Sequence, residues 1–478
     1  MVITEYCLDH ILRDGKATFG NHPYIFTRKQ DTFCGIAYSD FVDDVISAAC
    51  ILNRLNLCGR KILLYGSNSY TYLVADTAVM AYVGVSCTVS KEWSEKNVSE
   101  AVDFLDAGAI LYSKDKADVI TKVRAQYPDI LYIDMDELVS GKDGTMTELQ
   151  PISPDACCKI IFSSGTTGTP KAVMLTQQQM FANWESLKRR TPFTKNDKDY
   201  LFLPLSHTYA GICNFLYSLL SGMQIYLCSD SKCIMEELQM VRPTVFCTVP
   251  LILERIYAAS RSQNLSPRVL FGGELRYLFS GGAFLAPEIR QYLKEQNINL
   301  LEAYGLTETS SLISCEYPNR EDFESVGTVM ENLEIRIDAP DMDGSGEILV
   351  RGENLFLGYF RNESATSAAF DADGFFHTGD LGIYQDDKLY LKGRKRRMIL
   401  RSNGENIYPD EIEALLMVYP MIQRAKVYEK QSEVFAALYI NADLNADEII
   451  AEVNSKLPKY AQIQSYELIS DNIDVRLK

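Results

Sequence analysis

Two kinds of segment are missing from this sequence. No run of apolar residues is long enough to cross a bilayer. The first twenty residues, MVITEYCLDHILRDGKATFG, lack the basic start and apolar core of a signal peptide. Internal repeats and low-complexity tracts are absent as well. These absences predict a cytoplasmic globular protein with no membrane span.

Positive charge is in deficit. Lys and Arg number 47 against 64 Asp and Glu, which gives a formal net charge of −17 at pH 7. A field of this sign disfavours nucleic acid or an anionic membrane as the main partner. Any anionic ligand must therefore bind at a local positive site within a repulsive overall field.

A spaced set of metal ligands is also missing. The 12 cysteines all lie at or before Cys315, and none forms such a set with the four histidines. Cys157 and Cys158 are adjacent, which suits neither a zinc site nor an ordinary disulfide. We therefore expect reduced, mostly buried thiols.

The chain does contain the pattern of a large α/β protein. Its 478 residues are 47% hydrophobic and 23% charged, which predicts a folded chain of two or more domains. From about residue 40 to 300, strand-like runs such as KILLYG alternate with amphipathic helical stretches such as TYLVADTAVMAYVG. This alternation predicts parallel-rich sheets flanked by helices.

The residue pattern changes toward the carboxyl end. Short strands with frequent Gly and Asp between about 325 and 392 predict a β subdomain. After the basic stretch GRKRRMILRSNG, Pro409 is placed to start a helix. The predicted organisation is a large domain over residues 1–392 and a small α/β domain over residues 393–478.

The stretch SSGTTGTPKA, residues 163–172, follows an apolar strand-like run and is rich in hydroxyl groups and glycine. Such a loop offers hydroxyl and backbone N–H donors to a phosphate, and Lys171 adds a positive charge. The Walker A pattern does not fit, because Pro170 precedes the lysine and Ala172 follows it. A flexible polar loop is the alternative, but it leaves the position of the lysine unexplained.

The loop resembles the signature of the adenylate-forming superfamily, which includes acyl-CoA synthetases, firefly luciferase and the adenylation domains of nonribosomal peptide synthesis. The family pattern is close to S-G-T-T-G-x-P-K-G, and this chain departs from it at Ala172 and has Gln177 where His is common. Four further stretches follow in the family's order: FSGGAFLAPE (279–288), EAYGLTETS (302–310), FFHTGDLG (375–382) and the crossover segment from YLKGRKRR onward. The resemblance extends from about residue 35 to the carboxyl end.

The resemblance implies a nucleotide site. In it Tyr304 offers a face to adenine, Asp380 accepts hydrogen bonds from the ribose hydroxyls, and Arg394 contacts ribose or phosphate. Small residues of the glycine-rich turn let the backbone approach the base. The implied ATP/AMP-binding residues are Ser163, Ser164, Gly165, Thr166, Thr167, Gly168, Lys171, Gly281, Gly282, Ala283, Glu302, Ala303, Tyr304, Gly305, Thr307, Asp380 and Arg394.

The resemblance also implies a magnesium site and a hinge for the small domain. Glu308 is a hard carboxylate suited to Mg²⁺ bound to triphosphate, and Thr166 is the second expected metal contact. Taken alone, Thr307 and Glu308 fit the start of a helix equally well. Arg396 stands at the family hinge about which the small domain turns. The surrounding basic block is either a solvated charge run or a contact for a phosphorylated thiol donor.

The catalytic lysine lies where the sequence departs from the family. The terminal family motif is P-x-T-x-x-G-K, whereas this chain ends in YELISDNIDVRLK. Lys478 serves in a rewritten context, or the motif is lost, or the sequence stops short of it. We favour Lys478. The predicted catalytic set is Lys478, Thr307, Glu308 and His207.

The stretch LFLPLSHTYAGICNFLYSLLSGMQIYL, residues 201–227, resembles the family segment L-P-x-x-H-x-x-G that lines the acyl pocket. His207 stands at the histidine of acyl- and aryl-CoA ligases, and a buried core histidine is the alternative. No aspartate lies between residues 201 and 222 to bind a substrate ammonium, which disfavours a free amino acid. The predicted pocket, for an uncharged acyl or aryl group, comprises His207, Tyr209, Gly211, Gly305 and Leu306.

These features imply ATP-dependent activation of a carboxylic acid to an acyl-adenylate, with release of pyrophosphate, and then thioester formation on coenzyme A. The implied cofactors are ATP, Mg²⁺ and coenzyme A. A carrier-protein phosphopantetheine arm is the alternative thiol. A catalytically weakened nucleotide-binding scaffold is the alternative of a different class.

Overall fold

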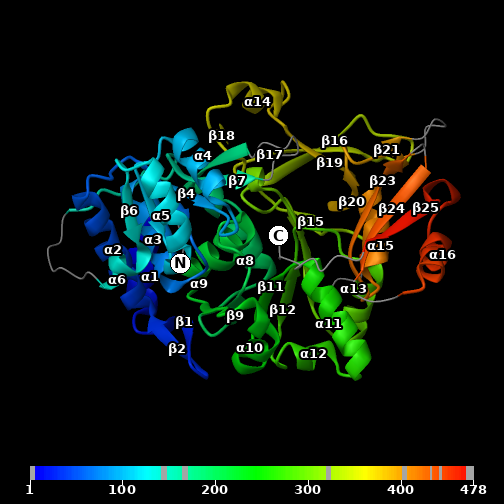
Figure 1. Cartoon of the computed structure of the whole chain (residues 1–478), viewed down its shortest axis with the longest axis horizontal. Coiled ribbons are helices and arrows are strands. Elements are labelled where there is room, and N and C mark those ends of the chain that lie inside the picture. Colours follow the sequence, from blue (N-terminus) through cyan, green and yellow to red (C-terminus); the bar gives the residue numbers. More distant parts are fainter. Residues whose placement is uncertain are drawn as a thin grey trace.

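A computed structural model describes residues 6–140, 148–163, 171–318, 324–400, 406–430, 433–440 and 444–469 (Figure 1). Within these residues the chain is a mixed α/β protein with two large sheets, a two-stranded ribbon and a three-stranded sheet. The predicted fold class is confirmed. All 12 cysteines are free, and most of them are buried or half-buried.

The first large sheet carries the strand before the predicted phosphate loop. Its seven strands run in the order β18-β8-β7-β4-β3-β5-β6, and β7, β4, β3, β5 and β6 are parallel. The run KILLYG forms β3, as its pattern predicts. The strands are β3 (Lys61–Tyr65), β4 (Val85–Val89), β5 (Ala109–Tyr112), β6 (Leu131–Asp134), β7 (Cys157–Ser163), β8 (Lys171–Thr176) and β18 (Gly358–Tyr359).

The second large sheet has thirteen strands, in the order β16-β17-β19-β20-β15-β14-β13-β12-β11-β9-β10-β1-β2. Its central strands β13, β12, β11, β9 and β10 are parallel, and the Gly- and Asp-rich stretch supplies the antiparallel strands at one end. The strands are β1 (Pro23–Lys29), β2 (Thr32–Ala37), β9 (Lys198–Leu201), β10 (Gln224–Leu227), β11 (Val245–Thr248), β12 (Tyr277–Ser280), β13 (Leu300–Tyr304), β14 (Ser314–Cys315), β15 (Thr328–Val329), β16 (Leu333–Asp338), β17 (Gly346–Gly352), β19 (Phe376–Gln385) and β20 (Lys388–Arg394).

Helices surround these sheets, and several begin at recognisable caps. The Ser69 side chain accepts from the Tyr72 amide at the start of α3, and Thr176 and Gln179 form a capping box on α7. The helices before residue 370 are α1 (Leu8–Phe19), α2 (Tyr38–Arg54), α3 (Tyr70–Ala78), η1 (Val79–Val83), α4 (Glu95–Leu105), η2 (Lys114–Lys116), α5 (Ala117–Gln126), α6 (Met135–Ser140), α7 (Gln177–Phe181), α8 (Trp184–Arg190), η3 (Tyr209–Leu216), α9 (Tyr217–Ser221), η4 (Ser231–Cys233), α10 (Ile234–Val241), α11 (Pro250–Gln263), α12 (Pro267–Leu270), α13 (Pro287–Glu295), η5 (Thr307–Thr309) and α14 (Glu363–Ala368).

The residues after β20 form a small α/β unit at the right of Figure 1. Pro409 is the first residue of α15, with Asp410 and Glu411 in the first turn, as predicted. A separate apolar core begins at Ile399 and ends at Ile463. The elements are β21 (Ile399–Leu400), β22 (Asn406–Ile407), α15 (Pro409–Met417), β23 (Ile422–Lys430), β24 (Glu433–Ile440), α16 (Ala446–Lys456), η6 (Lys459–Ala461) and β25 (Ser465–Ile469).

Gln177, one departure from the family pattern, is fully buried. Its amide nitrogen donates to the Met80 carbonyl at 3.0 Å, and its oxygen accepts from the Leu8 amide at 2.6 Å. The side chain therefore joins α1, η1 and α7. Gln177 therefore serves the packing of these helices, and its contacts are with Leu8 and Met80.

Candidate active site

The predicted phosphate loop joins the facing ends of two antiparallel strands. Ser163 ends β7 and Lys171 begins β8, and the two residues are paired across the strands. Five predicted nucleotide ligands, Ser164, Gly165, Thr166, Thr167 and Gly168, lie outside the described residues, as does the predicted catalytic Lys478. The structure therefore places only the two ends of the loop.

A buried ion pair anchors β7 four residues before the loop. The Lys159 ammonium lies 2.8 and 2.7 Å from the two carboxylate oxygens of Asp76 on α3, and both residues are at most 3% exposed. Removing one partner of such a pair leaves an uncompensated buried charge. The strand is thus held in place by a contact that the sequence pattern did not indicate.

Tyr359 connects the loop lysine to the predicted metal ligand. The Lys171 ammonium lies 4.3 Å from the centre of the Tyr359 ring. The Tyr359 hydroxyl donates to Glu308 Oε1 at 3.0 Å, and Glu308 Oε2 makes no hydrogen bond with the described residues. A carboxylate oxygen of this kind is a hard ligand of the type that Mg²⁺ prefers.

Asp380 lies at the predicted ribose position, where β19 pairs with β20. Its Oδ2 accepts from the Tyr304 hydroxyl at 2.7 Å, and its Oδ1 lies 2.8 Å from Arg394 Nε. Burial raises the pKa of Asp380 to about 6, although Arg394 and Tyr304 oppose the shift and Glu308 adds to it. Three predicted nucleotide residues thus meet at one buried carboxylate.

Two glycine turns lie side by side where the parallel strands β12 and β13 end. Ligands of α/β sheets bind beyond such carboxyl ends, where glycine lets the backbone approach closely. A Cβ on Gly281 would lie 3.1 Å from the Ala303 carbonyl oxygen, and one on Gly305 would lie 2.0 Å from that of Ser311. Gly305 has no room for a side chain, whereas a side chain at Gly281 would make a tight contact with the neighbouring backbone.

One cavity of about 710 Å³ joins the predicted acyl pocket to the predicted adenine turn. Nine predicted site residues line it: His207, Tyr209, Gly281, Gly282, Ala283, Ala303, Gly305, Leu306 and Thr307. Its wall also contains Phe202, Leu203, Leu205, Ala210, Val249 and Leu312. Its mouth carries Lys91 and Asp230, which sequence reasoning missed, and Lys91 makes no ion pair with the described residues.

The predicted site residues Glu302, Tyr304 and Gly211 do not line this cavity, and neither do the residues described above at the loop ends, at Glu308 and at Asp380. Glu302 is 5% exposed and lies 2.8 Å from Arg290 Nη1, whereas Tyr304 is 7% exposed and bonded to Asp380. Gly211 is buried in η3, and its amide donates to the His207 carbonyl at 2.9 Å. Each of these three residues contacts a neighbouring residue of the described chain.

His207 faces the cavity with an exposed side chain. Although the side chain is open to the cavity, the protein around the imidazole partly desolvates it, and this desolvation lowers the pKa of His207. The imidazole is therefore neutral at pH 7, in agreement with a wall for an uncharged group. The alternative is that Thr307 and Glu308 begin a helix, and the structure has only a short 3-10 helix over Thr307–Thr309.

A buried carboxyl lies in the layer behind the cavity. Asp199 on β9 is fully buried and accepts from Asn214 Nδ2 at 2.7 Å, and Asn214 lies on the same helix, η3, as Tyr209. Burial raises the pKa of Asp199 to about 7, although Asn214 and the Cys247 and Tyr200 amides oppose the shift. The folded chain therefore keeps this carboxyl partly protonated near neutral pH.

We expect Asp199→Asn to raise the free energy of unfolding at pH 8 by about 2 kcal/mol, with the gain vanishing near pH 4. The folded pKa lies above the unfolded value of 3.8, so the folded state binds more protons between about pH 4 and 7. Wild-type stability falls as pH rises through this window. Urea unfolding at the two pH values measures the difference, and Asp155→Asn, at an exposed carboxylate, is the control. An equal difference at both pH values would contradict the assignment.

Three residues of the basic stretch before the small unit pair with carboxylates of the described chain. Arg394 pairs with Asp380, Lys395 with Glu347 at 2.7 Å, and Arg397 with Asp410 and Glu413. Arg396 stands between a residue bound to the large sheet and one bound to α15. Arg401 lies outside the described residues.

Among the described residues no helix combines the length and hydropathy needed to cross a membrane.

The sequence model of the AMP-binding enzyme family matches residues 14–360. The chain is 28% identical to 4-coumarate–CoA ligase 4 of Arabidopsis thaliana, over 90% of this chain and 82% of the relative. It is 30% identical to 2-succinylbenzoate–CoA ligase of Bacillus licheniformis, over 66% of each.

Solved structures agree with the fold. O-succinylbenzoate coenzyme A synthetase from Bacillus subtilis, in complex with AMP, superposes with a TM-score of 0.82 at 23% identity, covering 96% of this chain and 94% of that one. An anthranilate CoA ligase in complex with anthranoyl-AMP gives a TM-score of 0.86 at 17% identity, covering 98% and 94%. With the family model spanning most of the chain, this protein belongs to the AMP-binding, adenylate-forming enzyme family.

Proposed function

We propose that this chain activates an uncharged acyl or aryl carboxylic acid with ATP and transfers the acyl group to the thiol of coenzyme A. The observation that carries the proposal is the single cavity that joins His207 and Tyr209 to the turn at Gly281 and to Thr307. An acyl group and a nucleotide bound in that cavity would meet beside Thr307. Relatives named as CoA ligases align over most of the chain, which favours coenzyme A as the thiol.

The first step needs alignment and neutralisation of charge. The carboxylate oxygen attacks the α-phosphorus of ATP, a P–O bond forms, and the bond to pyrophosphate breaks. Asp380 would hold the ribose, the Thr307 hydroxyl would donate to the reacting carboxylate or phosphate, and Lys171 would stabilise the loop. Bound at Glu308 and Thr166, Mg²⁺ would supply charge neutralisation to the triphosphate. Lys478 is the proposed lysine of this step.

In the second step the thiol sulfur attacks the acyl carbon and AMP leaves with the bonding electrons. The thiol proton passes to solvent. A neutral His207 and the apolar wall would give the acyl group an uncharged surface, and the charged lining residues Lys91 and Asp230 are exposed. The proposed hinge at Arg396 would remove Lys478 and admit the thiol between the two steps.

The test is carboxylate-dependent exchange of labelled pyrophosphate into ATP, over aliphatic, aromatic and amino acids. We expect exchange with one class of uncharged acid, none with amino acids, and about a 100-fold loss in Lys478→Ala. Lys459→Ala removes an exposed lysine from the same unit and is the matched control. Exchange without thioester formation on coenzyme A, but with formation on a phosphopantetheine carrier, would assign the other thiol.

The scaffold alternative has its own outcome in the same experiment. If AMP binds with wild-type affinity to both lysine variants and no acid supports exchange, the protein is a nucleotide-binding scaffold. The arrangement of Glu308, Tyr359 and Asp380 opposes this outcome, because it keeps carboxylates in positions that suit a metal and a ribose.

A further inference from the structure

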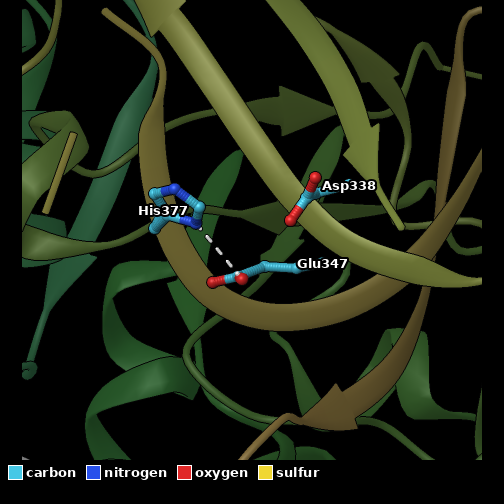
Figure 2. Close-up of side chains that lie close together, drawn as sticks. All are labelled: Asp338, Glu347 and His377. Atoms are coloured by element: carbon cyan, nitrogen blue, oxygen red, sulfur yellow. Dashed lines mark ion pairs between the residues drawn. The ribbon is translucent and has the colours of Figure 1, made fainter. Parts of the chain in front are cut away.

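Glu347 is a buried carboxylate outside the cavity that makes three contacts with the strands around Asp380. The residue lies on β17 and is 6% exposed. Its Oε1 accepts from the Gly379 amide at 3.1 Å, and its Oε2 lies 3.2 Å from His377 Nδ1 (Figure 2). The Lys395 ammonium reaches the same Oε2 at 2.7 Å. Within the part of the chain that the structure describes, each polar contact of this side chain is with the segment before Asp380 or the segment after Arg394.

These contacts lie on both sides of Asp380. His377 and Gly379 come before Asp380 on β19, and Lys395 comes directly after Arg394, which pairs with Asp380 across the two strands. The Lys395 amide also donates to the Gly379 carbonyl at 3.0 Å. One carboxylate therefore ties together the two segments that carry the Asp380–Arg394 pair.

The backbone there needs such support. Gly379 has a φ of +72°, and the pairing of β19 with β20 shifts register between Leu381 and Gly382. An irregular ladder leaves the position of Asp380 less determined by strand pairing. The Gly379 amide, which points to Glu347, would otherwise have no partner in the ladder.

The Lys395 ammonium, rather than a metal ion, balances the charge of the carboxylates around Glu347. Asp338, Glu347 and His377 bring their ligand atoms within 4.8 Å of one another, which is close enough to hold a metal ion. Lys395 already places a positive charge on Glu347, and Asp338 is exposed. The bonds from Lys395 and His377 outweigh burial and hold the pKa of Glu347 below its ordinary value. The carboxylate is therefore ionised and matched by residues of this chain.

We propose that Glu347 is a positioning residue of the nucleotide site, which fixes Asp380 and Arg394 through Gly379 and Lys395. The proposal rests on the proposed role of Asp380 as the ribose ligand. Glu347 itself does not line the cavity.

The test measures AMP binding by calorimetry, which needs neither an acid nor turnover, in Glu347→Gln, Asp380→Ala and the double variant. Glutamine keeps the size and an acceptor for Gly379 but loses the charge that holds Lys395. We expect Glu347→Gln to raise the Kd of AMP about tenfold, with the KM of the acid changing less than about twofold. The double variant is expected to bind no more weakly than Asp380→Ala alone.

Glu334→Gln is the matched control. Glu334 lies on the neighbouring strand β16 and pairs with Arg351 at 2.6 Å, so its replacement also removes a charge from this sheet. We expect wild-type AMP affinity in this variant. A shift of melting temperature without a change in the Kd of AMP in Glu347→Gln would make Glu347 merely structural and overturn the proposal.

The outcomes separate this proposal from the proposed function. Wild-type AMP binding in Asp380→Ala would reject the ribose role of Asp380 and with it the positioning role of Glu347, whereas the proposed reaction is decided separately by pyrophosphate exchange. If Asp380→Ala loses AMP binding and Glu347→Gln keeps wild-type AMP affinity, the positioning role of Glu347 alone is rejected. Binding of Zn²⁺ to the wild-type chain that disappears in His377→Ala would assign the cluster as a cation site and overturn the positioning role of Lys395.

Discussion

Asp380→Ala is expected to weaken AMP binding about 100-fold, because two charge-assisted hydrogen bonds to the ribose would be lost. The variant also leaves the Arg394 guanidinium and the Tyr304 hydroxyl without their shared partner. Calorimetry with AMP measures the loss directly. Because no acid is needed, the result does not depend on which substrate the enzyme uses.

The same carboxyl predicts a pH dependence. Burial raises the pKa of Asp380 to about 6. The ionised form accepts hydrogen bonds from the ribose, so affinity is full above this pKa and is lost as pH falls through it. AMP affinity of the wild type should therefore fall between about pH 7 and 5, whereas Asp380→Asn should bind weakly and without this slope.

Asp373→Ala provides the control for both measurements. Asp373 is exposed, lies seven residues before Asp380 and pairs with Arg336 at 3.0 Å. Its removal should leave AMP affinity and the pH slope unchanged. Tight binding of AMP by Asp380→Ala would place the ribose elsewhere.

Much of the fold follows from local pattern. The run KILLYG forms β3 and Pro409 begins α15, because a short apolar run and a fixed proline φ act within a few residues. The sequence also places nine of its predicted site residues at one cavity. Those residues follow the ends of neighbouring parallel strands, which meet at one edge of a sheet.

The contacts that the sequence does not predict join segments far apart in the chain. Tyr359 reaches Lys171 and Glu308 only because β18 pairs with β8, and Glu347 reaches Lys395 only because β19 lies between them. The periodicity of apolar residues within a strand or helix does not predict contacts between residues so far apart in the sequence. A motif identifies Tyr304 as a nucleotide residue, but it does not show that the hydroxyl already bonds Asp380.

Gly305→Ala is expected to destabilise the chain by about 3 kcal/mol and to lower pyrophosphate exchange at least about 100-fold. The added Cβ would lie 2.0 Å from the Ser311 carbonyl oxygen, 2.5 Å from the Ser311 carbonyl carbon and 2.8 Å from Leu312 Cα. All three atoms belong to the backbone, so no side-chain rotation relieves the clash. The turn from Leu306 to Ser311, which lines the cavity and carries Thr307, must move instead.

Gly344→Ala separates this effect from the general cost of replacing glycine. Gly344 has a φ of +83° and no atom within 4 Å of an added Cβ, so alanine there meets backbone strain alone, about 1 kcal/mol. Urea unfolding and pyrophosphate exchange measure both variants. We expect exchange to survive in Gly344→Ala and to fail in Gly305→Ala. Wild-type exchange in Gly305→Ala would mean that the acyl and nucleotide halves of the cavity do not depend on this close approach, because the turn beside Thr307 would then tolerate displacement without loss of the reaction.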